Sequence, residues 1–308
     1  MSITEEKLLQ WSTQESTDLC SQTYQFIKKH ICELPFFKEN QNDISLYLQG
    51  SYANNTNIRR DCDVDIVMQY NGVFGYDDSL LSTQEKESRK NHFESARFTF
   101  KEYKDIVYRQ LFNELLSCSR VKSVLKKAKS IRISLENPTI EVDIVPCFQY
   151  RKYISFSILD PYSSKHYREG IRFENTETDD LIINYPKLHK LNGENKSSHT
   201  NNRYKQTIRY IKKIKSLIIE KGYIDEKHVS SYFIENLLYN VPNQYFYNSC
   251  LKTFDTLVFF LKHSKLNDFQ CQHEQWKLFG DFSTQWNIDY AKEFIDILED
   301  ISTGRIIL

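Results

Sequence analysis

The stretch that decides the fold is residues 48–68, which read LQGSYANNTNIRRDCDVDIVM. Its second half alternates as a β-strand does, so that Asp63 and Asp65 share one side and the apolar residues after each of them share the other. Two carboxylates so close together repel each other unless a cation lies between them. Hard oxygen ligands of this kind suit Mg²⁺ held together with substrate phosphates. We therefore expect a metal-binding strand here.

The first half of the same stretch contains a glycine-serine pair at the end of another predicted strand. Gly50 lets the backbone come close to a phosphate, and Ser51 adds a hydroxyl and an N–H group that can hold phosphate oxygens. A glycine-serine pair alone usually marks an ordinary turn, and an isolated Asp-x-Asp is usually a solvated strand edge. Because the glycine-serine pair and the Asp-x-Asp pattern occur together at short spacing, we predict that Gly50 and Ser51 bind the triphosphate of a nucleoside triphosphate.

A two-metal site for in-line displacement needs a third acidic ligand. The sequence offers one in the alternating strand Ile140–Val145, which a predicted hairpin turn connects to a strand at Ser130–Leu135. Asp143 is the predicted third ligand. Glu141 lies on the same face two residues earlier, so periodicity does not decide between the two acids, and Glu141 is the second choice.

The pattern formed by Gly50, Ser51, Asp63, Asp65 and Asp143 resembles that of the nucleotidyltransferases of the DNA polymerase β type. More narrowly, the chain resembles the cGAS/DncV-like nucleotidyltransferases of bacterial anti-phage defence, which make cyclic oligonucleotides. Further segments that resemble this group are Asn184–His189, Thr200–Lys212, Ser230–Pro242, Leu278–Gly280 and Gln285-Trp286.

The resemblance implies an α/β (α+β) fold, with a polymerase β-type nucleotidyltransferase core, a C-terminal helical lobe and the active site in the cleft between them. We expect the catalytic core at residues 1–178, including a bracing helix at Thr17–Cys32, and the helical lobe at residues 179–308. The lobe is expected to complete the nucleotide pocket. Arg59, Arg60 and Asp61 are expected near the site, with Asp61 as a bystander.

The resemblance also implies roles for individual residues. Asp63, Asp65 and Asp143 are expected to be catalytic and to bind two Mg²⁺ ions, with Mn²⁺ as a substitute. Lys205 and Lys212 stand two turns apart on a predicted helix, so they can point the same way, and lysines at matching positions in the family contact the triphosphate. For each lysine a solvated surface position is the alternative. Ser231 is expected to hold phosphate and Tyr232 to stack on a base, with ordinary packing of Tyr232 as the alternative.

The implied function is the joining of ribonucleoside triphosphates into a cyclic di- or trinucleotide second messenger, with release of pyrophosphate. The product would act on a separate effector, and regulatory proteins are a further class of partner. Two alternatives stay open. One is an RNA- or protein-directed nucleotidyltransferase, and the other is an inactive nucleotide-binding regulator on the same fold.

Composition restricts these expectations without producing them. Lysine plus arginine and aspartate plus glutamate each number 41, so no overall positive charge indicates a nucleic-acid partner. The seven cysteines contain no Cys-x-x-Cys pair and no zinc-like cluster, which favours a reducing cytoplasm. No apolar run is long enough to span a bilayer. We expect a cytoplasmic monomer that needs neither a membrane nor DNA activation.

Three further local predictions concern the elements around the site. Residues 71–98 are polar and are predicted to form an insertion or mobile loop. Thr99–Ser117 has helical spacing, and Thr200 is predicted to cap a helix that continues to Ile219. Arg132 belongs to a basic cluster at residues 122–132 that is interpreted as a solvated face, with a nucleic-acid groove as the minority alternative.

Overall fold

The computed structural model describes residues 3–14, 18–58, 63–96, 98–282 and 284–308. These form two compact units. The sheet unit comprises Thr17–Gln49 and Cys62–Lys187, and the helical unit comprises Met1–Ser16, Gly50–Asp61 and Leu188–Leu308. The helical unit thus takes in two segments from the predicted core range 1–178. Helix α1 (Glu5–Ser12) packs on two helices of the C-terminal part, which explains why residues before 17 group with it.

The sheet unit is built on one seven-stranded sheet, in which the strands pair in the order β1-β2-β5-β4-β3, and β6 pairs with both β5 and β7. Strands β2 and β5 are parallel, and the other pairs are antiparallel. The strands are β1 (Ile44–Gln49), β2 (Asp63–Asp77), β3 (Val121–Lys126), β4 (Ile131–Leu135), β5 (Ile140–Tyr153), β6 (Tyr167–Glu174) and β7 (Leu181–Asn184). The predicted strands around the acids are therefore confirmed.

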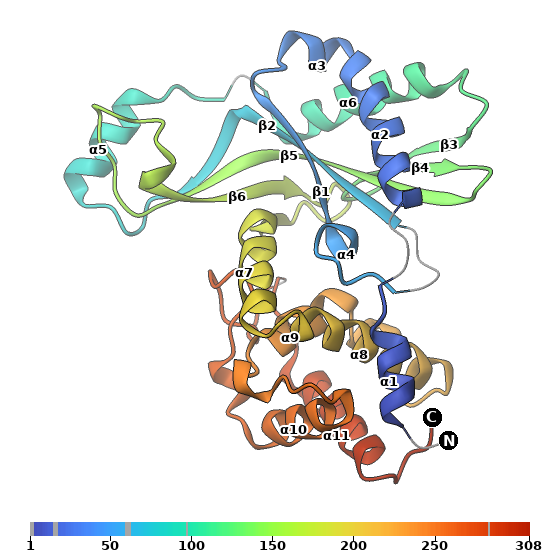
Figure 1. Ribbon diagram of the computed structural model, residues 1–308. Helices are drawn as coiled ribbons and strands as arrows, with labels where there is room; N and C mark the ends of the chain where they lie inside the picture. The colour runs from blue at the N-terminus through green and yellow to red at the C-terminus, as the bar shows by residue number, and fades with distance from the viewer. Residues whose placement is uncertain (1–2, 15–17, 59–62, 97, 283) are drawn as a thin grey trace. The chain divides into compact units, whose positions relative to one another are not determined.

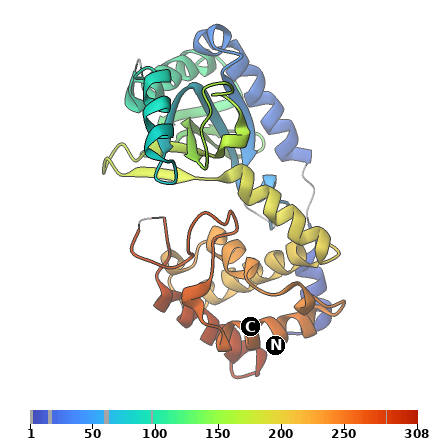
Figure 2. The same ribbon diagram turned by 90° about the vertical axis from the view of Figure 1, so that its left-hand side faces the viewer.

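Three helices cover one face of this sheet: α2 (Asp18–Glu33), α3 (Pro35–Glu39) and α6 (Phe100–Leu115) (Figures 1 and 2). Val64, Ile66 and Met68 are fully buried, and the hydroxyl of Tyr103 on α6 donates to the backbone oxygen of Met68 at 3.0 Å. The predicted alternation of β2 is confirmed. The acids Asp63 and Asp65 are consequently on the face of β2 opposite to the one that these helices bury.

Strand β2 contains an irregularity where the loop was predicted. Tyr70 pairs with Phe148, but the next pair is Phe74 with Gln149, so three residues of β2 are left over. The strand then continues to Asp77 and is followed by α5 (Thr83–His92), which Ser82 begins with a capping box. The prediction of a loop over residues 71–98 is therefore wrong. Residues 74–77 pair with β5, and the Phe74 ring packs against the guanidinium of Arg151 at 3.8 Å and the ring of Phe93 at 4.9 Å, measured to centroids.

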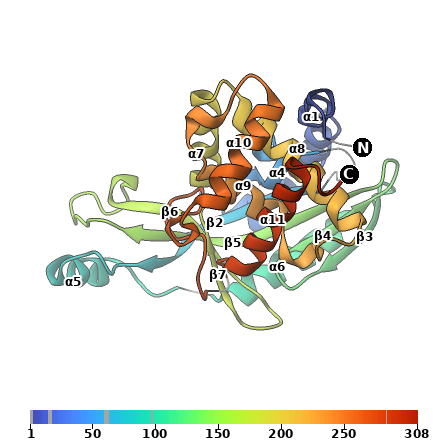
Figure 3. The same ribbon diagram turned by 90° about the horizontal axis from the view of Figure 1, so that it is seen from below.

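The helical unit contains α4 (Gly50–Ala53), most of α7 (Pro186–His199), α8 (Arg203–Glu220), α9 (Ser231–Tyr239), α10 (Cys250–His263) and α11 (Ile288–Ser302). Its apolar core includes Ile211, Ile214, Phe233, Phe254 and Phe294, and α10 and α11 lie side by side (Figure 3). Short 3₁₀ turns occur at Ser164–His166, Glu226–His228, Asn243–Tyr245 and Leu266–Asp268. None of the helices in the described ranges combines the length and the apolar character that crossing a bilayer requires.

The start of α8 differs from the prediction. The N-cap is Asn202, and α8 begins at Arg203. Thr200 lies earlier, where its hydroxyl accepts the backbone N–H of Tyr204 at 3.1 Å and donates to the carbonyl of Lys196 at 2.9 Å. Thr200 therefore connects the end of α7 to the first turn of α8 and is not the cap.

Candidate active site

The parallel pairing of β2 with β5 brings acidic side chains together. Asp65 is the direct partner of Asp143, and Asp63 is the partner of Glu141. Directly paired residues of neighbouring strands project from the same face of the sheet, so all four acids lie on one face. The strand register makes Asp143, and not Glu141, the direct neighbour of Asp65. The period of the sequence pattern alone does not distinguish these two acids.

Asp143 is held by two residues of the neighbouring hairpin. Arg132, its direct partner on β4, donates from Nη2 to Oδ2 at 2.6 Å and from Nε to Oδ1 at 3.2 Å. The hydroxyl of Ser130 donates to Oδ1 at 2.8 Å. Arg132 Nε also lies 3.7 Å from Oε2 of Glu141. The interpretation of the basic cluster as a solvated face is therefore wrong for Arg132, because its charge faces the acids.

The surroundings of Asp65 raise the pKa of its carboxyl group. Burial raises the pKa of Asp65, the charges of Asp143 and Asp63 raise it further, and Arg132 lowers it, with a net value of about 7. The contact with Asp143 raises the pKa of Arg132 in turn. Burial and the neighbouring negative charges thus both favour the protonated form of Asp65.

The chemistry of these acids fits a divalent cation. Within the described ranges no three His, Cys, Asp or Glu side chains converge closely enough to hold a metal by themselves. However, Mg²⁺ in phosphoryl-transfer sites is commonly held by one or two carboxylates together with phosphate oxygens of the substrate. Burial first, and then the charges of Asp143 and Asp63, raise the pKa of Asp65, and a bound cation would favour its ionised form. Asp63 and Asp143 would supply the further carboxylate oxygens.

The glycine-serine pair begins helix α4, directly after β1 ends at Gln49. Gly50 has a φ of 72°, in the left-handed region that favours glycine. The backbone N–H of Thr56 donates to the carbonyl of Ser51 at 2.9 Å, and that of Asn54 donates to the carbonyl of Gly50 at 3.2 Å. These bonds fold residues 50–56 into a compact turn, which we call the phosphate segment after the phosphate binding predicted for Gly50 and Ser51. Arg59, Arg60 and Asp61, also expected near the site, lie outside the described residues.

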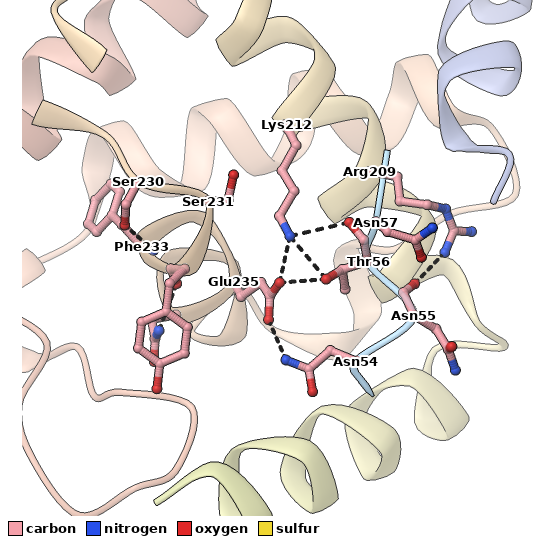
Figure 4. Close-up of polar contacts among 12 residues, drawn as sticks. Asn54, Asn55, Thr56, Asn57, Arg209, Lys212, Ser230, Ser231, Phe233 and Glu235 are labelled. Carbon is pink, nitrogen blue, oxygen red and sulfur yellow. Dashed lines mark hydrogen bonds and ion pairs between the residues drawn. The ribbon is translucent and has the colours of Figure 1, made fainter. Parts of the chain in front are cut away.

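The two predicted lysines on α8 have different surroundings. Lys212 is buried, and its ammonium donates to Glu235 Oε1 at 2.6 Å and to Thr56 Oγ1 at 3.0 Å (Figure 4). Lys205 is half-buried, and within the described part of the chain its ammonium makes no hydrogen bond or ion pair. Burial lowers the pKa of Lys205. Phosphate binding stays a prediction for both Lys205 and Lys212.

Ser231 and Tyr232 lie in the first turn of α9, after the N-cap Ser230. Lys215 Nζ lies 3.4 Å from the hydroxyl of Ser231, so a cation and a hydroxyl group occur together here. The Tyr232 ring lies 4.7 Å from the ring of His189 and 5.7 Å from that of Trp286, measured between centroids. Tyr232 is partly exposed and packs against both rings. Its stacking on a base stays a prediction.

Sequence reasoning missed two features of these sites. One is the pairing of Arg132 with Asp143, which counting back across the predicted hairpin could have found, since both strands were placed. The other is the buried carboxylate of Glu235, which accepts hydrogen bonds from the phosphate segment. No signal in the sequence indicated this contact, because 179 residues separate Thr56 from Glu235.

Matches to known protein families and to known proteins cover both the N-terminal and the C-terminal parts of the chain and indicate the same family. Residues 34–163 match the model of a nucleotidyltransferase domain, and residues 191–303 match that of the cGAS/DncV-like nucleotidyltransferase C-terminal helical domain. The chain is 39% identical to the cyclic nucleotide synthase CdnE01 of Staphylococcus haemolyticus, over 96% of this chain and 97% of that protein.

Solved structures give the same result. A CdnE c-UMP-AMP synthase structure from Rhodothermus marinus, with Apcpp and Upnpp, has a TM-score of 0.84 and 35% identity, covering 98% of this chain and 97% of that one. A CdnE cyclic dinucleotide synthase from Elizabethkingia meningoseptica, with GTP and Apcpp, has a TM-score of 0.76 and 28% identity, covering 98% and 100%. Both the sheet unit and the helical unit therefore have counterparts in proteins that synthesise cyclic nucleotides.

Proposed function

This chain belongs to the cGAS/DncV-like nucleotidyltransferases, and from that premise we propose how its residues carry out the reaction. It is a nucleotidyltransferase enzyme that makes a cyclic di- or oligonucleotide from ribonucleoside triphosphates, for anti-phage signalling. The observation that carries the residue assignment is the direct pairing of Asp65 with Asp143 across β2 and β5.

Enzymes with this domain depend on divalent metal ions. We propose two Mg²⁺ ions, replaceable by Mn²⁺, held by Asp63, Asp65 and Asp143. A bound divalent cation would polarise the phosphoryl oxygens and neutralise charge that develops on them. Asp65 must lose its proton to take this role, and its pKa of about 7 places that step near neutral pH.

In the proposed reaction Asp143 helps to remove the proton from a ribose hydroxyl of the acceptor nucleotide. That hydroxyl oxygen forms a bond to the α-phosphorus of the donor, while the bond from this phosphorus to the pyrophosphate oxygen breaks. Repetition of the step within the linear product closes the ring. Arg132 and Ser130 hold the carboxylate of Asp143 in a defined orientation in the absence of ligands.

The donor triphosphate is proposed to bind to Gly50, Ser51, Lys205 and Ser231. Backbone N–H groups at the start of α4 and the ammonium of Lys205 would neutralise the β- and γ-phosphates, where negative charge accumulates during transfer. Tyr232 would stack on a base. Lys212 would act on the triphosphate through the phosphate segment, because its ammonium already bonds to Thr56.

The test is a product assay with the purified protein. It is incubated with all four ribonucleoside triphosphates and Mg²⁺ or Mn²⁺ and treated with phosphatase, and the resistant products are identified by mass. We expect a resistant cyclic product that the Asp63→Ala/Asp65→Ala variant does not make. Products of an RNA-directed or protein-directed enzyme would instead be linear or attached to a polymer. Nucleotide binding without any pyrophosphate release would favour the inactive regulator.

We further propose that the enzyme works in the cytoplasm as a monomer and that its product acts on a separately encoded effector. A regulatory protein partner belongs to the same proposal. Size-exclusion chromatography with light scattering, with and without nucleotides, tests the monomer.

A further inference from the structure

A single buried carboxylate connects four parts of the helical unit. Glu235 on α9 accepts hydrogen bonds from Lys212 on α8 at 2.6 Å, from Asn54 Nδ2 at 2.9 Å and from the hydroxyl of Thr56 (Figure 4). It also accepts one from His189 Nε2 at 3.0 Å. A carboxylate only accepts, so Nε2 carries the proton of His189. Each oxygen of Glu235 therefore has two donors, and its carboxylate is fully hydrogen-bonded.

The burial of Glu235 and Lys212 indicates a role other than stabilising the fold. The side chains of Lys212 and Glu235 are 2% and 4% exposed. Burial raises the pKa of Glu235, but Lys212 and His189 lower it by more, so the net pKa lies well below its usual range. Buried ion pairs of this kind often contribute no more to stability than apolar residues of similar volume would. What this pair does accomplish is to order the polar residues around it.

Those residues belong to the phosphate segment. Asn54 and Thr56 bond to Glu235 through their side chains, and through their backbone N–H groups they bond to the carbonyls of Gly50 and Ser51. Lys212 adds a second contact to Thr56, at its carbonyl oxygen. The conformation of Gly50 and Ser51 is thus connected to Glu235 by two short routes, each of one residue.

Neighbouring contacts fix the rest of the segment. Arg209, one turn before Lys212 on α8, donates to the carbonyl of Asn55 at 2.8 Å. Asn55 itself has a φ of 55°, a left-handed conformation that is uncommon for a residue other than glycine. A backbone of this kind persists only where its surroundings determine it, and here α8 and α9 provide them.

We propose that Glu235 is a positioning residue for nucleotidyl transfer, which holds the phosphate segment in the conformation that binds the donor triphosphate. It touches no reacting atom and acts through Asn54 and Thr56. This inference rests on the proposed function of Gly50 and Ser51. It also gives Lys212 a defined task, because this lysine keeps Glu235 ionised and adds its own bonds to Thr56.

The experiment compares two ways of cutting the same connection. Glu235→Gln removes the charge at nearly constant shape. Asn54→Ala/Thr56→Val removes the two donors of the segment and leaves the ion pair of Glu235 with Lys212 in place. Glu220→Gln, an exposed carboxylate at the end of α8, is the matched control. Hydrogen exchange of the backbone N–H groups of Asn54 and Thr56 measures the local stability of the phosphate segment, and this measurement requires no nucleotide.

We expect these two amides to exchange about tenfold faster or more in Glu235→Gln, a factor that corresponds to about 1.4 kcal/mol of local stability. The KM for nucleoside triphosphate should rise by a similar factor with a smaller change in kcat, as expected when binding common to ground and transition states is lost. Asn54→Ala/Thr56→Val, the donor double variant, should have the same KM as Glu235→Gln. Combining the two sets of changes should raise the KM little further.

Two results would overturn the proposal. One is unchanged amide exchange in Glu235→Gln, and the other is a catalytic defect in Glu235→Gln that the donor double variant does not share. If Glu235→Gln does not fold, the donor double variant carries the test alone, and an unchanged KM in it refutes the proposal. A wild-type protein that makes no cyclic product would refute the proposed function instead, while the amide exchange still decides whether Glu235 orders the segment.

Discussion

The guanidinium of Arg132 pairs with both carboxylate oxygens of Asp143, with Nη2 2.6 Å from Oδ2 and Nε 3.2 Å from Oδ1. This two-point pairing is the geometry in which arginine binds a carboxylate most strongly. Arg132 also lies within 4 Å of Glu141. The arginine therefore supplies positive charge to two of the acids, Asp143 and Glu141, at once.

Arg132→Gln should lower the melting temperature of the protein in EDTA. The change removes positive charge from the half-buried acids, so repulsion between Asp65 and Asp143 increases. Added Mg²⁺ should then raise the melting temperature of the variant by more than that of the wild type, because the cation restores a larger missing charge. Differential scanning calorimetry with and without Mg²⁺ measures both values. Arg168→Gln, at an exposed position of β6, should respond to Mg²⁺ as the wild type does.

Asp143→Asn and Glu141→Gln should differ sharply in activity. Only Asp143 is the direct neighbour of Asp65, so in the proposed site its loss would remove an oxygen ligand of the catalytic cation. A loss of about 10²-fold or more in kcat is expected, since metal ions contribute several kcal/mol to transition-state stabilisation. Glu141→Gln should stay within a few-fold of the wild type. Release of pyrophosphate measures both variants, and equal losses would argue against the assignment of Asp143.

Asp65→Asn should stabilise the metal-free protein most at high pH. The folded-state pKa of Asp65 is raised to about 7, above its ordinary value of 3.8. Its contribution to stability is therefore fully present below about pH 3.8 and is lost as pH rises through 7. Asparagine stays neutral throughout, so the gain in melting temperature over the wild type should increase from pH 5 to pH 8 in EDTA.

The control for this pH series is Asp160→Asn, an exposed carboxylate of the same unit. Its difference from the wild type should stay constant over the same range. If the gain of Asp65→Asn also stayed constant, the carboxyl of Asp65 would titrate well away from neutral pH, contrary to the expectation.

Tyr103→Phe should lower the free energy of unfolding by about 1 kcal/mol, because the change leaves the buried carbonyl of Met68 without its hydroxyl donor. Urea unfolding followed by circular dichroism measures the difference. Activity at a temperature where both proteins are folded should change little, since Tyr103 packs on the face of β2 opposite to Asp65. A large loss of activity at full folding would show that the two faces of the strand are coupled.

The sequence was sufficient to predict the elements that carry chemistry. Strict alternation around Asp63 and Asp65, and again around Asp143, is a pattern with period two that few other structures produce, so the strands and their faces follow from it. The N-cap role of Ser230, which the structure shows, is equally local, because a serine before an apolar helix can bond the exposed N–H groups of the first turn.

Long-range relationships could not be predicted in the same way. Helical spacing places Lys205 and Lys212 on one side of α8 but does not say what each ammonium contacts, and Lys212 turned out to pair with a carboxylate on another helix. The loop predicted over residues 71–98 fails for a related reason. Its aromatic residues are isolated in the sequence and gain partners such as Arg151 only when β2 lies beside β5.

Three residues of β2, between Tyr70 and Phe74, have no partner on β5, and their number constrains how this strand can change in length. Because three is odd, even-numbered residues after the irregularity project from the face that odd-numbered residues occupy before it, so Phe74 and Tyr76 share a face with Asp65. Loss or gain of one residue here would move the side chains of one half of β2, either the half with Phe74 and Tyr76 or the half with Asp63 and Asp65, to the opposite face of the sheet. Length variants of this segment should therefore be viable only in steps of two residues, and natural or engineered chains that obey this rule would retain both faces.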